Sequence, residues 1–74
     1  MQVTIKLFAA LRAGRFEVET RMLRPGATVK DVMEDLRIQR RDMGVVLVNS
    51  RHAGPDRALE DGDTLAIFPL VGGG

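Results

Sequence analysis

The residues most able to do chemistry are the three glycines at the end of the sequence, Gly72, Gly73 and Gly74. A glycine run adds little to a core, because glycine loses the most entropy when it is ordered and has no side chain to pack. It can instead form a thin arm that ends in an unhindered carboxylate. We therefore expect Gly74 to carry the reactive group. Gly72 and Gly73 would let the arm, which reaches roughly 20 Å from Phe68 when extended, thread into a narrow site on another protein.

Other side chains with catalytic or ligand chemistry are few. The sequence has no cysteine, which excludes a disulfide, a thiolate metal site and a thiol nucleophile. His52 is the single histidine, and its polar surroundings favour a solvated side chain. Asp61 and Asp63 flank Gly62 but are too few for a calcium loop, so we interpret them as turn formers. We expect no metal site and no bound cofactor.

The charges do not indicate a nucleic-acid ligand. Eleven basic residues are balanced by ten acidic ones, and there is no tyrosine or tryptophan on which a base could stack. The first seven residues alternate like a strand and do not resemble a signal peptide. No apolar stretch is long enough to span a bilayer. The sequence therefore predicts a cytoplasmic protein without membrane or nucleic-acid partners.

The N-terminal third of the sequence has the pattern of a β-hairpin. Val3, Ile5 and Leu7 alternate with polar residues, as in a half-buried strand. A second alternating run covers residues 16–21, and Gly14 in the connection can adopt a positive φ angle. Two strands this close in sequence most simply pair in antiparallel fashion.

A helix is expected after the Pro25-Gly26 turn. Thr28 and Asp31 resemble a capping box, in which each side chain bonds the other residue's backbone N–H. An apolar stripe for packing on the sheet follows at helical spacing: Val29, Val32, Met33 and Leu36. Residues 37–44 are interpreted as a ragged helix end and a loop.

Two further strands are expected in the C-terminal half. The run Val45–Val48 is continuously apolar, which is typical of a strand buried on both faces. A polar connection follows over residues 49–58, Leu59 would fill the core, and a turn leads into the last strand, residues 64–68.

This order of elements predicts an α+β domain of the ubiquitin-like β-grasp type. We expect a mixed sheet of four to five strands, with one main helix packed on one face and with the first and last strands side by side in the centre. Residues 1–68 would form the domain, and residues 69–74 would form a flexible C-terminal tail.

Three segments resemble the MoaD/ThiS family of small sulfur-carrier proteins. They are Lys6–Arg12, then Val48-Asn49 with the later turn Leu59–Asp63, and finally Phe68–Gly74. The Leu-x-Asp-Gly-Asp turn and the Gly-Gly end are specific in combination, and together with the element order the resemblance covers essentially the whole chain. The Phe-Pro-x-Val stretch looks more like the small subunit of molybdopterin synthase than like the thiamine-pathway carrier.

The resemblance implies a carrier rather than an enzyme. In this family an ATP-using, ubiquitin-activating-like adenylyltransferase joins the C-terminal carboxylate to AMP. A persulfide sulfur donor then attacks, which gives a thiocarboxylate at Gly74. In the closest resemblance that group delivers sulfur to a pterin precursor held by a larger synthase subunit.

The resemblance also implies a docking surface. Phe8 and Phe68 match apolar contact positions of the family, and Pro69, Leu70 and Val71 lead into the glycines. The sequence departs from the family at two points. Gly72 is an extra glycine, and the third apolar contact position is occupied by His52 or Ala53.

Other functions remain open on the sequence alone. The sulfur could enter thiamine thiazole, tRNA thiolation or a tungsten pterin. Gly74 could instead form amide bonds to lysines, as in a ubiquitin-like modifier, because the activated intermediate is the same. A non-covalent β-grasp interaction module would not use its terminus at all.

Overall fold

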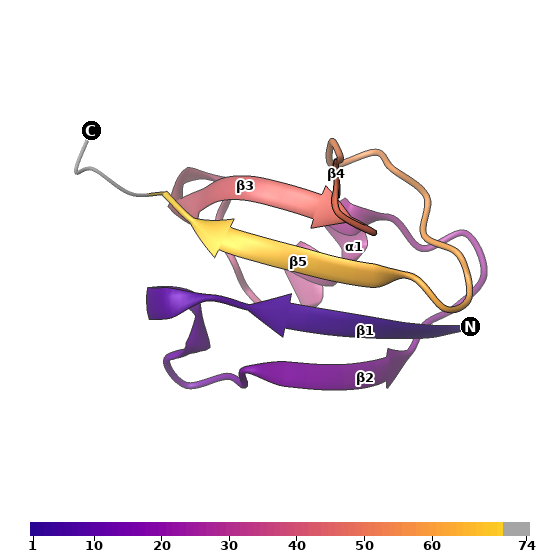
Figure 1. Cartoon of the computed structure of the whole chain (residues 1–74), viewed down its shortest axis with the longest axis horizontal. Helices are drawn as coiled ribbons and strands as arrows, with labels where there is room; N and C mark the ends of the chain where they lie inside the picture. Colours follow the sequence, from indigo (N-terminus) through magenta and orange to yellow (C-terminus); the bar gives the residue numbers. More distant parts are fainter. Residues whose placement is uncertain (71–74) are drawn as a thin grey trace.

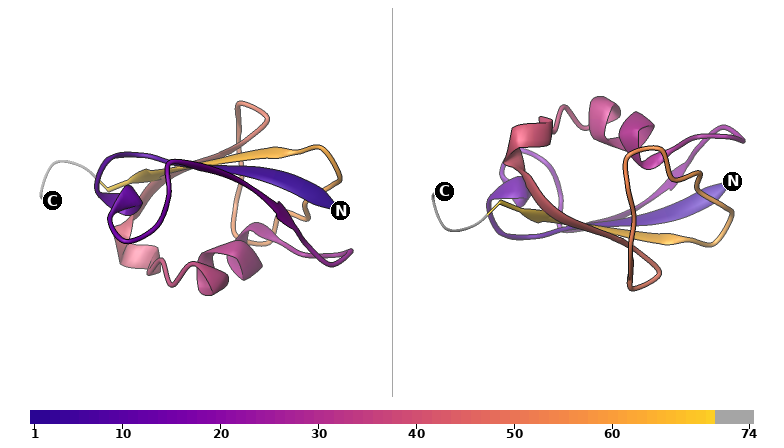
Figure 2. Two further views of the ribbon diagram at one scale, coloured as in Figure 1. Left: turned by 90° about the horizontal axis from the view of Figure 1, so that it is seen from below. Right: turned by 90° about the horizontal axis from the view of Figure 1, so that it is seen from above.

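The computed structural model describes residues 1–70, which form a mixed sheet with a single α-helix on one of its faces (Figures 1 and 2). The sheet order is β2-β1-β5-β3-β4. The elements are β1 (Gln2–Leu7), β2 (Val18–Met22), α1 (Val29–Asp35), β3 (Met43–Val48), β4 (Arg51–His52) and β5 (Thr64–Pro69). β1 and β5 are parallel neighbours, which confirms the predicted β-grasp arrangement.

The predicted hairpin is confirmed, and its second strand turns its charged residues toward the helix side. β1 and β2 are antiparallel, with Ile5 opposite Glu19. Because directly opposite residues share a face, Glu19 lies on the same side as the buried Ile5. Val18 therefore points to the other face and is 55% exposed. Gly14, in the connection, has the expected positive φ of 69°.

Helix α1 begins with the predicted capping box. The Thr28 hydroxyl accepts a hydrogen bond from the Asp31 N–H at 3.3 Å, and the Thr28 N–H donates to the Asp31 carboxylate at 2.9 Å. The second bond is the main cause that lowers the pKa of the Asp31 carboxyl group below its usual value. The backbone N–H groups of Thr28 and Asp31, which have no partner within the helix, are thus both hydrogen-bonded.

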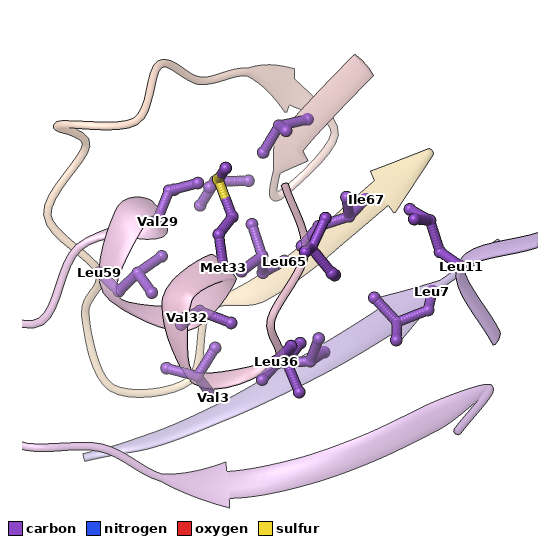
Figure 3. Packing of buried hydrophobic residues seen from close by; sticks show 14 residues of the cluster. Val3, Leu7, Leu11, Val29, Val32, Met33, Leu36, Leu59, Leu65 and Ile67 are labelled. Atoms are coloured by element: carbon purple, nitrogen blue, oxygen red, sulfur yellow. The ribbon is translucent and has the colours of Figure 1, made fainter. Parts of the chain in front are cut away.

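The apolar stripe of α1 packs on the sheet and closes one core (Figure 3). Alternate residues of β1 and β5 form the sheet side of this core, and Leu59 is buried in it, as predicted. The buried set includes Val3, Ile5, Leu7, Val29, Val32, Met33, Leu36, Leu59, Leu65 and Ile67. Within residues 1–70, no helix lies on the opposite face of the sheet (Figure 2).

This open face corrects the prediction for β3. Val46 and Val48 are buried against the helix side, but Val45 is 40% exposed and Leu47 is only half-buried. The continuous apolar run is therefore not buried on both faces, because none of the described elements covers the outer one. The strand also starts two residues earlier than predicted, at Met43, directly after the short 3-10 helix η2 (Arg40–Asp42).

The predicted polar connection between β3 and β5 contains the short strand β4. Arg51 and His52 pair with the end of β3 after a turn in which Asn49 and Ser50 both have positive φ. The hydrophobic pattern gave no signal for β4, because both of its residues are polar and exposed.

Candidate functional site

The last strand, β5, brings the chain to its C-terminal residues through the middle of the sheet (Figure 1). Its last described residues are held by the start of β3. Pro69 pairs with Met43, and the Leu70 N–H donates to the Asp42 carbonyl at 3.0 Å. The backbone is thus fixed as far as Leu70. Val71, Gly72, Gly73 and Gly74 lie outside the described residues.

Gly44 lies directly against this end of β5. A Cβ atom built on Gly44 would lie 2.5 Å from the Pro69 carbonyl oxygen and 3.2 Å from the Leu70 Cα. Only a residue without a side chain allows the two backbones to approach this closely. The pairing of β3 with β5 also shifts register between Met43 and Val46, which is the mark of a bulge.

Phe8 and Phe68 lie together beside this point, on the open face of the sheet. Leu7 is opposite Ile67 in the parallel pair of β1 with β5, so the next residue of each strand shares the outer face. The two rings stack with centroids 4.1 Å apart and planes 11° apart. Both phenylalanines remain partly exposed. The structure therefore brings together the two aromatic residues that the sequence singled out.

Positive charge borders the aromatic pair. The Arg12 guanidinium lies 5.5 Å from the centre of the Phe8 ring, a cation–π distance. Its Nε donates to the Leu7 carbonyl at 2.7 Å, which fixes the side chain beside the ring. Next to Phe8, a shallow groove of about 490 Å³ runs across the open face past Lys6, Leu47 and Ala66. The groove is lined by both apolar and polar side chains, and the Arg12 guanidinium beside Phe8 lies 3.6 Å from the Glu17 carboxylate.

The Asp-Gly-Asp turn is structural, as predicted. Asp63 is 6% exposed, and its carboxylate accepts bonds from the Asn49 side-chain amide and the Glu60 N–H, both at 2.8 Å. The side-chain Oδ1 of Asn49 accepts from the Thr64 N–H at 2.9 Å. Asp61 in turn accepts from the Gln2 N–H at 2.7 Å. These bonds tie the turn and the start of β5 to the end of β3 and to the start of β1.

Sequence reasoning missed three residues that support the site. Asp42 and Gly44 hold the end of β5, and the Arg15 guanidinium donates to the carbonyls of Leu11, Leu36 and Arg37 at 2.9–3.1 Å. Only Gly44 carried a usable signal, since a glycine at the start of a strand often marks a close backbone approach.

His52 and Ala53, the two candidates for a third contact position, differ in their exposure. His52 is exposed on β4, whereas Ala53 is half-buried and packs against the core, so His52 is the residue of the two that reaches solvent. Within residues 1–70, no group of three or more histidine, cysteine, aspartate or glutamate side chains is placed to hold a metal ion. Among the described helices, none has the length and apolar character required to cross a membrane.

Comparisons with known proteins agree with this geometry. The family model of the ThiS family matches residues 5–74. A protein described as molybdopterin converting factor, subunit 1, from Pyrococcus furiosus is 30% identical, with a TM-score of 0.78 over 96% of this chain and 99% of that one. SAMP1 from Haloferax volcanii is 31% identical, with a TM-score of 0.77 over the whole of both chains.

A more distant structure shares the fold. In the complex of subunits 1 and 2 of molybdopterin-converting factor from Helicobacter pylori, the matching chain is 18% identical, with a TM-score of 0.68 over the full length of both chains. No curated protein matches the sequence significantly. With its β-grasp sheet and a family match that runs to Gly74, the chain belongs to the ThiS family of ubiquitin-like sulfur-carrier proteins.

Proposed function

We propose that this protein carries sulfur as a thiocarboxylate on Gly74. The observation that carries the proposal is the arrangement at the end of β5. The strand crosses the centre of the sheet, is fixed through Leu70, and ends beside the exposed Phe8–Phe68 stack. A partner that docks on the aromatic pair would find the Leu70 backbone beside it, held by the Asp42 carbonyl.

The chemistry requires activation from outside the chain. The Gly74 carboxylate attacks the α-phosphate of ATP, pyrophosphate leaves, and an acyl adenylate forms. A persulfide sulfur then attacks the acyl carbon with AMP as leaving group, and a second thiol cleaves the resulting sulfur–sulfur bond to release the thiocarboxylate. A ubiquitin-activating-like adenylyltransferase and a persulfide donor would supply these groups, since the sequence has no cysteine of its own.

The three glycines fit a role in close approach. A side chain at Gly73 or Gly74 would crowd the acyl carbon and the walls of any channel that reaches it. Ordering such a segment costs roughly 1–2 kcal/mol per residue, so the affinity for a partner must come from the folded domain. Phe8 and Phe68 are the natural source of that affinity, because half-exposed aromatic side chains are typical anchors of interfaces.

The acceptor that the similarities favour is a molybdopterin precursor on a larger synthase subunit. The Pyrococcus relative is described as a molybdopterin converting factor subunit, and the Helicobacter structure contains subunits 1 and 2 together. On this chain, Pro69, Leu70 and Val71 would follow the aromatic pair into that subunit. Lys6, in the groove beside Phe8, suits a partner that has an acidic group at the rim of its apolar pocket.

Protein modification is a second candidate, and one observation favours it. SAMP1, a small archaeal modifier protein, matches the chain over its whole length. The same acyl adenylate would then be passed to the amine of a lysine. The two functions differ only after activation, so they can be separated by their products.

Intact-mass spectrometry tests the proposal directly. The full chain is incubated with ATP, a cognate activating enzyme and a sulfide source, and the expected product gains the mass difference between one sulfur and one oxygen. A chain extended by one residue beyond Gly74 is the matched control and should gain nothing. An unchanged mass in the intact chain, with the activating enzyme shown to be active, would refute the proposal. A ladder of larger species on a denaturing gel would instead support modification.

A further inference from the structure

The free edge of β2 has a pattern of backbone groups that can pair with another strand. β2 is the last strand on its side of the sheet. The Leu7 N–H bonds the Glu17 carbonyl at 2.9 Å, and the Leu23 N–H bonds the Met1 carbonyl at 2.7 Å. Odd-numbered residues of this segment thus face β1. The N–H and C=O groups of the even-numbered residues point toward the free edge.

The side chains along this edge would be complementary to those of a second, antiparallel copy of the same strand. The strand reads Val18-Glu19-Thr20-Arg21-Met22. Val18 and Met22 share the open face of the sheet and are 55% and 73% exposed. Glu19 and Arg21 share the helix face and are bonded within the chain at 3.0 Å. An antiparallel copy centred on Thr20 would place each residue opposite a suitable partner.

We propose that the β2 edge binds the β2 edge of a second copy of this chain. The two strands pair antiparallel about a two-fold axis at Thr20, and the two sheets become one continuous sheet. Thr20 bonds Thr20 of the other copy, and Val18 bonds Met22, through the outward backbone groups. On one face Val18 packs against Met22. On the other face, Glu19 of each copy lies opposite Arg21 of the other.

Charge selects this register over its neighbours. Moving the two-fold axis by one residue toward Glu19 would place the two Glu19 carboxylates directly opposite each other. Moving it by one residue toward Arg21 would place the two Arg21 guanidinium groups opposite each other. Directly opposed like charges destabilise a strand pair, whereas opposite charges stabilise it. Of these three registers, only the one centred on Thr20 pairs the charged residues of β2 with opposite charges and places no like charges opposite each other.

The dimer leaves the proposed docking surface accessible. β5 and the Phe8–Phe68 stack are separated from the β2 edge by β1, so each copy keeps its aromatic pair accessible. β2 has five residues. Two paired strands of this length bury less surface than the about 1,200 Å² or more that is buried in stable complexes. Association is therefore expected at roughly millimolar protein concentration. The inference does not depend on the reaction at Gly74.

A charge-swap experiment on the full-length chain tests the register. In sedimentation equilibrium, Glu19→Arg and Arg21→Glu should each self-associate roughly tenfold more weakly than the wild type, because each turns both cross-strand ion pairs into like-charge pairs. An equimolar mixture of the two variants should recover association, since every pair is again of opposite sign. Glu60→Arg, which changes net charge by the same amount as Glu19→Arg but lies in the turn before β5, should associate like the wild type.

A second measurement does not depend on the stability of these variants. In wild-type protein, the amides of Val18, Thr20 and Met22 should exchange with solvent more slowly as concentration rises. Thr20→Pro removes an outward N–H, a change that edge strands tolerate, and should abolish association. A wild type that stays monomeric at millimolar concentration would overturn the inference. So would single-charge variants that associate as well as the wild type, or a mixture that associates no better than its components.

Discussion

Gly44→Ala should disturb the C-terminal end of β5 more than any other part of the fold. The new Cβ atom would lie 2.5 Å from the Pro69 carbonyl oxygen, whereas ordinary contacts begin at 3.4 Å. The neighbouring atoms are backbone, so the Pro69 peptide itself must move by close to 1 Å. Such overpacking typically costs about 1–3 kcal/mol of unfolding free energy. The reduced entropy of the unfolded chain returns about 0.4–1 kcal/mol, so we expect a net loss of about 1–2 kcal/mol.

Gly54→Ala is the matched control. A Cβ atom on Gly54 would meet nothing within 4 Å, and its φ angle is not among the positive ones. This variant should be as stable as the wild type or more stable by up to about 1 kcal/mol. Urea unfolding of both variants measures the difference, and the amide resonance of Leu70 reports whether its bond to the Asp42 carbonyl survives.

The functional consequence should exceed the loss of stability. A misplacement of about 1 Å in a reacting group can cost about 100-fold in rate. At a temperature where both alanine variants are fully folded, thiocarboxylate formation on Gly44→Ala should fall about 10- to 100-fold in kcat. The KM for the activating enzyme should change little, because Phe8 and Phe68 are untouched. If Gly44→Ala unfolds at the same urea concentration as Gly54→Ala and is loaded with sulfur as fast, the reasoning about Gly44 is wrong.

Three further predictions concern the docking surface, the turn and the helix cap. Phe8→Ala or Phe68→Ala should remove a ring stack worth about 0.5–1.5 kcal/mol. Either variant should also weaken binding of the activating enzyme, which would be measured as a higher KM. An unchanged KM would exclude the aromatic pair from the interface. Asp63→Ala leaves the Glu60 N–H and the Asn49 amide without their acceptor, and should lower the free energy of unfolding by about 2–4 kcal/mol in urea. The pKa of Asp31 is lowered by the fold, so its ionised form stabilises the protein above its unfolded pKa, and that stabilisation is lost as pH falls through the lower folded value. The stability advantage of wild type over Asp31→Asn should therefore be constant near neutral pH and vanish in acid, and a difference that persists at pH 2 would contradict this.

Much of the fold follows from local patterns in the sequence. The alternation of Val3, Ile5 and Leu7 predicted the inward face of β1, and the helix cap at Thr28 was found at the correct residue. These predictions succeed because hydrophobic period and capping depend on neighbours in sequence. Phe8 and Phe68 each follow a buried residue, Leu7 or Ile67, so the same alternation places them on the open face, where their rings stack.

Features that depend on long-range geometry were not predictable in this way. The orientation of β2 is set by its register with β1, so the apolar Val18 was turned outward without any local sign. The exposure of Val45 depends on the absence of a second layer on the sheet. Gly44 owes its role to Pro69, a residue distant in sequence. In each case the deciding neighbour is brought close only by the completed fold.

The two ends of β5 are held by different contacts. Substitutions at the two ends should therefore differ in their effects on stability and on sulfur loading. Its start is fixed by the buried hydrogen bonds of Asp63, and its end by the close contact of Gly44 with Pro69. A change at the start should loosen the whole sheet, because β5 pairs with both β1 and β3 there. A change at the end should cost less stability and should mainly displace the Pro69 and Leu70 backbone. Under conditions where it is still folded, Asp63→Ala should therefore accept sulfur at close to the wild-type rate. Gly44→Ala should accept sulfur more slowly than the wild type, although it is expected to be more stable than Asp63→Ala. Equal loading rates in the two folded variants would show that the direction of the last residues does not control the reaction.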